Sequence, residues 1–311
     1  MMKPIMAILL GMDAGGTSTR AALAVDERIV ARASGGSIKV MRVTPAKAEQ
    51  HLRDILNELV THSGIKLEQI TAACVGIAGN NVASVHQWVW QTLGPMLHED
   101  LDVCCDIDIA LDAAFPGQAG VLVIAGTGSN ILGRTRSGAL VNVGGWGPML
   151  ADEGSGYWIG HQALRSALRA YDRGASSTLL GAVLAQWKIA RLDELVEIAH
   201  AHPAPDFAAL TRVVVQQADA GDELARSILR AAGKALAQDA ALALDKLRAL
   251  DDEAPTRLAF TGSVLEHIAP VRITMIQELE RLKPGVQVLA HAVDPVEGAL
   301  WRARRLAGAL S

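Results

Sequence analysis

Two glycine-rich turns, each directly after a short apolar run, constrain the fold of this chain more than any other feature. The first, DAGGTST, occupies residues 13–19 after the apolar residues 5–10, and the second, AGTGSN, occupies residues 125–130 after the apolar residues 121–124. The residues on both sides of each turn have strand character, so each turn is predicted to be a tight hairpin. Its backbone N–H groups point to one side and no Cβ blocks an approaching anion, which suits a polyphosphate.

The first turn differs from better-known glycine loops. A Rossmann fingerprint opens a helix, whereas residues 17–25 contain Thr and Val, end in a turn at Asp26-Glu27 and read as a strand. A Walker loop requires Gly-Lys followed by Ser or Thr, and the sequence has no such tripeptide. One such turn is equally consistent with a purely structural hairpin. Two in one chain, the first with an acidic residue, favour a nucleotide held by both.

The strand pattern around the turns occurs twice. In the first half the predicted strands are residues 5–12, 17–25, 29–33, 70–78 and 101–105. The predicted helices are residues 46–62 and 82–93, and residues 107–115 are a helix or a turn. After a break at Pro116-Gly117-Gln118, three strands are predicted again at residues 120–124, 130–134 and 139–143. This restart indicates an internal duplication.

The second half then departs from the first. Residues 153–250 are almost wholly helical in pattern, and they are followed by predicted strands at 257–261 and 286–290 and a closing helix at 295–310. We therefore expect an α/β fold with an open mixed sheet in each half and helices on the sheet faces.

Composition excludes several classes of protein. A chain of 311 residues has room for two domains. Its net charge of −4 gives no electrostatic reason to bind nucleic acid, and Arg302, Arg304 and Arg305 are predicted to form the solvated face of the last helix. No apolar run approaches the ~20 residues of a membrane span, and residues 6–10 are too short for a signal peptide. A cytoplasmic protein is expected.

The three cysteines, Cys74, Cys104 and Cys105, lie in apolar runs with strand character. Their number is odd and two are adjacent. They are predicted to be reduced core residues, not a disulfide framework or a zinc site. The histidines show no metal-ligand spacing, and no G-x-S-x-G elbow of an α/β-hydrolase is present.

Two acidic residues that end predicted strands are candidates for chemistry. Asp13 could hold hydrated Mg²⁺ beside phosphates, or it could cap its own turn. Asp106 could accept the proton of an attacking hydroxyl, or it could be a helix N-cap. Asp108 and Asp112 are rivals for the role of base, although Asp112 falls inside a helical pattern where a solvated position is expected.

Two further segments could contact a ligand. The stretches GGWG at residues 144–147 and DEGSGYWIG at 152–160 are dense in glycine, acid and tryptophan. Asp152 there could accept hydrogen bonds from sugar hydroxyls, or the stretch could be an irregular loop before a helix. Gly262-Ser263 follows a short strand and could let a flat base approach the backbone, or it could start a helix.

The order of these motifs resembles the BadF/BadG/BcrA/BcrD ATPase family. The motifs on which the resemblance rests are DAGGTST, IAGTGSN, GGWG and DEGSGYWIG, and the resemblance covers essentially the whole chain. It is greatest to N-acetylglucosamine kinases and bacterial glucosamine kinases. It implies an actin-like ATPase (ribonuclease H-like) fold with ATP in the cleft between two domains. These are residues 1–115, with a closing helix at 296–311 packed back on them, and residues 116–295, with a helical insertion at 153–250.

The resemblance also implies roles for individual residues. The base would be Asp106, and the acid associated with magnesium would be Asp13. Contacts to ATP would come from Gly15, Gly16, Thr17, Thr127, Gly128, Gly262 and Ser263. Contacts to the sugar would come from Ser129, Asn130, Gly145, Trp146, Gly147 and Asp152.

Two departures from the family pattern concern the acceptor. The family offers a sugar-binding Asn after the third strand, whereas residues 35–40 here read GGSIKV. The catalytic acid is usually preceded by Asn, and here it follows Cys105. The nucleotide half of the prediction is therefore firmer than the choice of sugar.

The predicted function is an ATP- and Mg²⁺-dependent kinase for the 6-hydroxyl of N-acetylglucosamine or glucosamine, expected to be a homodimer. One alternative is an ATPase activator of a radical dehydratase, which needs cysteines that hold an iron–sulfur cluster across a dimer. The adjacent Cys104 and Cys105 fit that poorly. Another alternative is a non-catalytic sugar-binding regulator. Such a protein is expected to carry a DNA-binding helix-turn-helix, and a first strand near residue 5 leaves no room for one.

Overall fold

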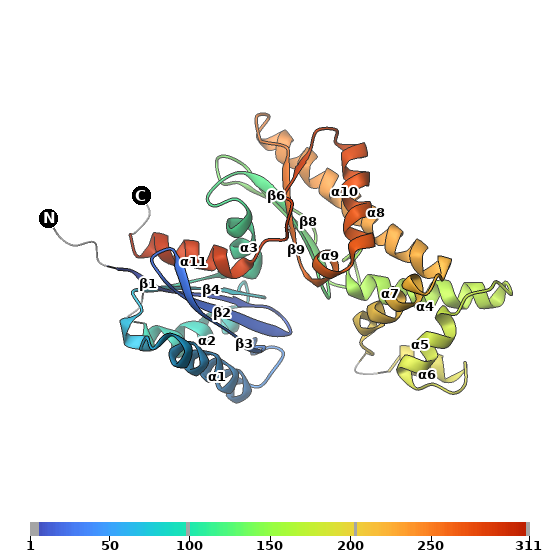
Figure 1. Cartoon of the computed structure of the whole chain (residues 1–311), viewed down its shortest axis with the longest axis horizontal. Coiled ribbons are helices and arrows are strands. Elements are labelled where there is room, and N and C mark those ends of the chain that lie inside the picture. The colour runs from blue at the N-terminus through green and yellow to red at the C-terminus, as the bar shows by residue number, and fades with distance from the viewer. Residues whose placement is uncertain (1–5, 98–99, 202–203, 309–311) are drawn as a thin grey trace. The chain divides into compact units, whose positions relative to one another are not determined.

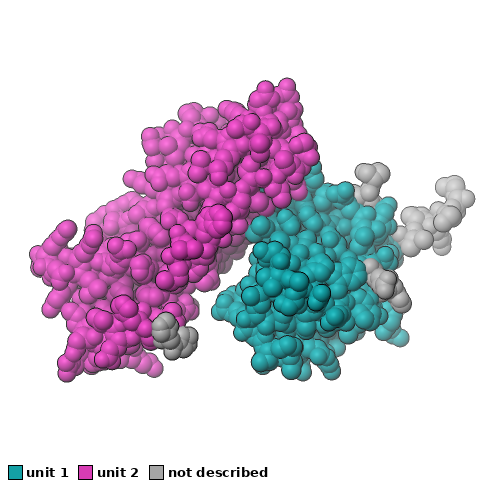
Figure 2. Space-filling model, turned by 180° about the vertical axis from the view of Figure 1, so that it is seen from behind, with its two compact units in different colours: residues 1–118, 293–311 teal, residues 119–292 magenta. Residues whose placement is uncertain are grey.

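The computed structural model describes residues 6–97, 100–201 and 204–308 (Figure 1). The chain forms two compact units, coloured separately in Figure 2. Unit 1 comprises Met1–Gln118 and Val293–Ser311, and unit 2 comprises Ala119–Ala292. The predicted start of the first strand at Ile5, and the predicted extension of the closing helix to residues 309–311, lie outside the described residues.

Unit 1 is built on a five-stranded mixed sheet in the order β3-β2-β1-β4-β5. The strands are β1 (Ile8–Ala14), β2 (Ser18–Val25), β3 (Arg28–Gly36), β4 (Ala72–Ile77) and β5 (Leu101–Cys105). Strand β1 is antiparallel to β2 but parallel to β4, which is parallel to β5. The carboxyl ends of β1, β4 and β5 therefore share one edge of the sheet. Ligands collect at such an edge in open α/β sheets.

Helices cover both faces of this sheet. They are α1 (Pro45–Ser63) and α2 (Ala83–Leu93) on one face and α3 (Asp106–Ala114) and α11 (Pro295–Leu306) on the other, with short 3₁₀ turns η1 (Leu67–Gln69) and η2 (Gly94–Met96) (Figure 1). Leu9 packs toward α11 and its neighbour Leu10 toward α1, as the alternation of a strand requires. All six residues of β4 are buried, which explains its unbroken apolar sequence.

Unit 2 repeats the sheet of unit 1, in the order β10-β9-β6-β7-β8. Its strands are β6 (Gly120–Ala125), β7 (Ser129–Arg134), β8 (Leu140–Gly144), β9 (Arg257–Thr261) and β10 (Gln287–Val288). Strand β6 is antiparallel to β7 and parallel to β9, so the β6–β7 hairpin holds the position that β1–β2 holds in unit 1. This equivalence supports the duplication that the sequence predicts.

The remaining helices of unit 2 are α4 (Gly156–Asp172), α5 (Leu179–Trp187), α6 (Glu194–Ala199), the 3₁₀ turn η3 (Phe207–Ala209), α7 (Leu210–Asp219), α8 (Glu223–Leu250), α9 (Ser263–His267) and α10 (Ala269–Leu282). The long helix α8 begins where the Asp222 side chain accepts from the Ala225 N–H at 3.0 Å. Across the described ranges, no helix is both long and apolar enough to span a bilayer.

One glycine allows α11 to pack on α3. A Cβ on Gly298 would lie 1.8 Å from the carbonyl oxygen of Ile109, so a side chain there would push the two helices apart. We expect Gly298→Ala to lower the free energy of unfolding by about 2–3 kcal/mol, the usual cost of overpacking. Gly181→Ala is the matched control, because a Cβ on this helical glycine meets nothing within 4 Å. Chemical denaturation of both variants measures the difference, and equal stabilities would contradict this packing.

Candidate functional site

The bend between β1 and β2 consists of Gly15, Gly16 and Thr17. The strand pair next to the bend is Ala14 with Thr19. The Ser37 hydroxyl donates to the Gly15 carbonyl oxygen at 3.3 Å and so fastens the bend to the chain after β3. Apart from its chain neighbours, a Cβ on Gly16 would meet only the Arg42 guanidinium, at 3.9 Å. Packing within unit 1 therefore leaves one side of the bend open.

Asp13 and Asp106 lie at the carboxyl edge of the unit 1 sheet. Asp13 is the penultimate residue of β1, and Asp106 is the first residue of α3 directly after β5. Asp13 accepts from the Arg20 guanidinium at 2.7 Å, and Arg20 is its partner across the hairpin. Burial, and next the negative charge of Asp13, raise the pKa of Asp106 to about 6. A carboxylate tuned in this way is suited to accept a proton near neutral pH.

The surroundings of Asp106 separate it from its two rivals. Asp108 accepts from the backbone N–H of Cys105 at 3.2 Å and so caps α3. Asp112 was expected to be solvated, and that expectation is wrong. Its side chain is 1% exposed and accepts from the Arg302 guanidinium at 2.6 Å, because α11 covers this face of α3. Arg302 likewise does not lie on a solvated face, since three quarters of its side chain is buried.

The loop after β3 brings a lysine to the same edge. The positive charge of Lys39 opposes the two effects that raise the pKa of Asp106. Its ammonium would lie 3.3 Å from a Cβ on Gly79, in the loop after β4. Lys39 was not among the predicted site residues. It lies in the segment where the family's sugar-binding Asn is missing.

In unit 2 the bend between β6 and β7 is closed by the start of α4. The Gly126 N–H donates to the Gly128 carbonyl at 2.9 Å, and the N–H groups of Gly156 and Tyr157 donate to the carbonyls of Gly126 and Thr127. Hydrogen bonds within the protein therefore satisfy the carbonyl groups of Gly126, Thr127 and Gly128 in this bend. Thr127 itself is exposed.

Asp152 lies directly against this bend. Its carboxylate oxygen would be 2.5 Å from a Cβ on Gly128, so only glycine fits at that position. It accepts from the Gly147 N–H at 3.2 Å, and its backbone has the left-handed φ of 68°. Burial is the largest cause that raises the pKa of Asp152. A buried carboxylate held by backbone amides and strained in φ is typical of a functional position.

The other predicted sugar contacts surround Asp152. The Asn130 side chain lies against Gly145, and its buried Oδ1 has no hydrogen-bond partner among the residues that the structure describes. Trp146 is 75% exposed. The Ser129 hydroxyl donates to the Glu153 carbonyl at 2.9 Å, so its first role is to hold the loop that carries Asp152.

Gly262 and Ser263 lie on the other side of the second bend. Gly262 has a φ of 100°, and a Cβ there would lie 2.4 Å from the Ala125 carbonyl oxygen, so β9 and β6 approach as closely as glycine allows. A hollow of about 330 Å³ opens beside them. Its lining consists of Gly126, Thr127, Gly156, Ala208, Thr211, Ser263, Val264 and Ile268. Thr127 and Ser263, predicted separately as ATP contacts, thus line one hollow.

Several residues of this hollow were missed from the sequence. Thr211 in α7 donates its hydroxyl to the Gly156 carbonyl at 2.8 Å, and Ala208 lies in the nearby turn η3. The helical pattern of residues 153–250 marks both segments only as an insertion. No local motif distinguishes them, because their place depends on how α7 packs on α4.

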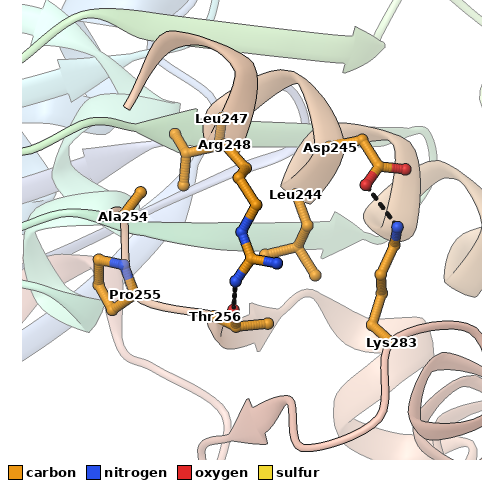
Figure 3. A pocket seen from close by; sticks show the side chains of 8 residues that line it. All are labelled: Leu244, Asp245, Leu247, Arg248, Ala254, Pro255, Thr256 and Lys283. Carbon is orange, nitrogen blue, oxygen red and sulfur yellow. Dashed lines mark hydrogen bonds and ion pairs between the residues drawn. The ribbon is translucent and has the colours of Figure 1, made fainter. Parts of the chain in front are cut away.

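A second hollow of unit 2, of about 280 Å³, contains none of the predicted site residues (Figure 3). Arg248 and Lys283 lie in its lining, but Arg248 donates to the Thr256 hydroxyl at 3.0 Å and Lys283 forms an ion pair with Asp245. Both cations already have protein partners, so this hollow is a weaker candidate for binding phosphate.

The sequence matches the BadF/BadG/BcrA/BcrD ATPase family over residues 10–303. It is 28% identical to an N-acetylmuramic acid/N-acetylglucosamine kinase of Clostridium acetobutylicum over 96% of this chain and 99% of that protein. It is 29% identical to an N-acetyl-D-glucosamine kinase of Dictyostelium discoideum over 94% of this chain and 96% of that protein.

The fold is also similar to a solved structure from Chromobacterium violaceum that is provisionally assigned as an N-acetylglucosamine kinase. The TM-score is 0.73 and the identity is 28%, over 97% of this chain and 99% of that one. The similarity extends over both units, and this agrees with the actin-like α/β fold predicted from the order of the motifs.

Proposed function

Because this chain belongs to the BadF/BadG/BcrA/BcrD ATPase family, and its relatives with known names are sugar kinases, we propose that it is an ATP-dependent kinase that phosphorylates the 6-hydroxyl of an amino sugar. The observation that carries the proposal is the environment of Asp106. Its half-buried carboxylate, with a pKa raised to about 6, lies at the first residue of α3 directly after β5, beside Asp13 and the open glycine bend.

Asp106 has the role of general base in this mechanism. It accepts the proton of the sugar hydroxyl as the oxygen attacks the γ-phosphorus of ATP. The bond from that phosphorus to the bridging oxygen breaks, and ADP leaves with the electron pair. Little covalent chemistry is required of the protein, because phosphoryl transfer depends mainly on positioning and on charge stabilisation.

The backbone amides of the two bends are proposed to bind the phosphates of ATP. In unit 1 these belong to Gly15, Gly16 and Thr17, and in unit 2 to Thr127 and Gly128. The open side of the first bend supports this assignment. Ser263, next to Gly262 and in the same hollow as Thr127, is proposed to lie at the adenosine side.

The residues at the unit 1 edge fit a hydrated magnesium ion. Mg²⁺ prefers one or two carboxylates together with water and phosphate oxygens, and Asp13 supplies such a carboxylate at the carboxyl end of β1. The ion would supply positive charge to the phosphate oxygens. The Arg20 guanidinium, 2.7 Å from Asp13, orients that carboxylate.

The acceptor side is proposed to consist of Asn130, Gly145, Trp146, Gly147 and Asp152, with Ser129 holding their loop. The Oδ1 of Asn130, which has no hydrogen-bond partner within the described part of the chain, and the buried carboxylate of Asp152 can both accept hydrogen bonds from sugar hydroxyls. N-acetylglucosamine is the preferred acceptor, since the Clostridium and Dictyostelium relatives carry it in their names. A cytoplasmic homodimer is part of the same proposal and rests on the family resemblance.

The test is ADP release by the purified protein with N-acetylglucosamine, glucosamine, N-acetylmuramic acid, glucose or no sugar. We expect release that depends on an amino sugar, with a 6-phosphate product identified by NMR. Equal rates with and without every sugar would reject the kinase and favour an ATPase activator.

A further inference from the structure

Unit 1 contains a cluster of metal-binding side chains that the kinase reaction does not use. Cys74 on β4 and Asp102 and Cys104 on β5 offer two sulfurs and one carboxylate oxygen, all within 4.8 Å of one another. The register explains the cluster. Cys74 lies directly opposite Asp102 in the parallel pair, and Cys104, two residues further along β5, points to the same face.

The distances in the cluster match those of a tetrahedral metal site. Bonds of about 2.3 Å to sulfur place two thiolates about 3.8 Å apart around a zinc ion, and the Cys74 and Cys104 sulfurs are 3.8 Å apart. With a bond of about 2.0 Å to oxygen, the expected separation of sulfur and oxygen is about 3.5 Å. Cys74 Sγ and Asp102 Oδ2 are 3.7 Å apart. Both separations from the Cys74 sulfur are thus already close to those that a tetrahedral metal requires.

The surroundings favour a soft cation over a hard one. Cys74 is fully buried and Cys104 is 7% exposed, whereas 37% of the Asp102 side chain reaches solvent, which provides a path of entry. Mg²⁺ prefers an all-oxygen shell, so two thiols exclude it. From α11, the Arg302 guanidinium donates to Asp102 at 3.4 Å and to Asp112 at 2.6 Å.

We propose that Cys74, Cys104 and Asp102 form a binding site for a thiophilic dication of the zinc type, with a water molecule in the fourth position on the solvent side of Asp102. Uptake replaces both thiol protons by two metal–sulfur bonds and releases the protons to solvent. Binding should therefore be accompanied by measurable acidification of a weakly buffered solution.

The test is titration of the full chain with Cd²⁺, whose bonds to thiolate give a charge-transfer band in the ultraviolet. Cys105 provides the matched control. It is adjacent to Cys104 in sequence but is not part of the cluster. We expect one Cd²⁺ per chain in the wild type and in Cys105→Ser, with competition by Zn²⁺, and loss of the band in Cys74→Ser and Cys104→Ser. Native mass spectrometry of the same samples counts the bound ions.

Three results would overturn the site. One is an equal Cd²⁺ band in all four proteins. Another is a band that disappears in Cys105→Ser but survives in Cys74→Ser. A Cys74–Cys104 disulfide that forms under mild peroxide while Cd²⁺ fails to bind the reduced protein would also reject a metal site. Circular dichroism establishes that each variant is folded. No step of the test uses kinase activity, so failure of the proposed function would leave this result unaffected.

Discussion

We expect replacement of Asp106 by Asn to lower kcat by about 10²- to 10⁴-fold, the usual contribution of a general base. Asn has the same shape, so the bond that the Ile107 N–H donates to Asp106 Oδ1 at 3.1 Å can persist, and the start of α3 should not change. The loss should therefore appear in kcat, with little change in the affinity for ATP. Steady-state kinetics with the best sugar of the panel, and equilibrium binding of a non-hydrolysable ATP analogue, separate the two quantities.

Asp108→Asn is the control, because this carboxylate is two residues away and caps the Cys105 N–H. We expect its turnover to stay within a few-fold of the wild type, since an amide oxygen can accept the same bond. If Asp106→Asn retained near-normal turnover, the role of base would pass to another acid of unit 1.

The pH dependence provides a second readout of the same residue. The base is competent only when it is ionised, and burial and Asp13 raise the pKa of Asp106 to about 6. The value of kcat/KM for the wild type should therefore be near its maximum above pH 7 and fall as the pH decreases through about 6. The residual activity of Asp106→Asn should lack this limb. A limb that persists in the variant would assign it to a different group.

The hairpins could be predicted from the sequence because all their information is local. An apolar run, a cluster of glycines and a second strand suffice to define β1–β2 and β6–β7. The same pattern recurs in the second half of the chain and so predicts the second sheet. The same locality placed Asp106 correctly after β5, since the predicted strand at residues 101–105 ends at the carboxylate.

The sequence could not predict features that depend on distant segments. Asp112 has the spacing of a solvated helical residue, yet α11 covers it from almost two hundred residues further along the chain. The closeness of Cys74 and Cys104 depends on the parallel register of β4 and β5. Lys39 is an ordinary loop lysine until the loop after β3 folds toward Asp106. In each case the missing information is tertiary packing, which local pattern does not carry.

Gly128→Ala is expected to impair catalysis nearly as severely as loss of the base. The added methyl group would lie 2.5 Å from the Asp152 carboxylate oxygen, so the second bend or the Asp152 loop must shift. A displacement near 1 Å in a substrate-positioning group costs on the order of 10²-fold in rate. If Asp152 contacts the sugar, kcat/KM for the sugar should fall by about that factor. Initial rates at varied sugar concentration measure the loss.

A double-mutant cycle with Asp152→Ala identifies the cause. If Gly128→Ala acts by displacing Asp152, the double variant should be little worse than either single variant, because the same interaction is lost only once. If the losses multiply instead, the methyl group acts on the phosphate-binding amides of the bend and not on the acceptor side. Trp146→Ala alters the exposed part of the same loop. It tests whether any change in this loop is non-additive with Gly128→Ala. Its losses should multiply with those of Gly128→Ala, since the glycine contacts Asp152 and not the indole.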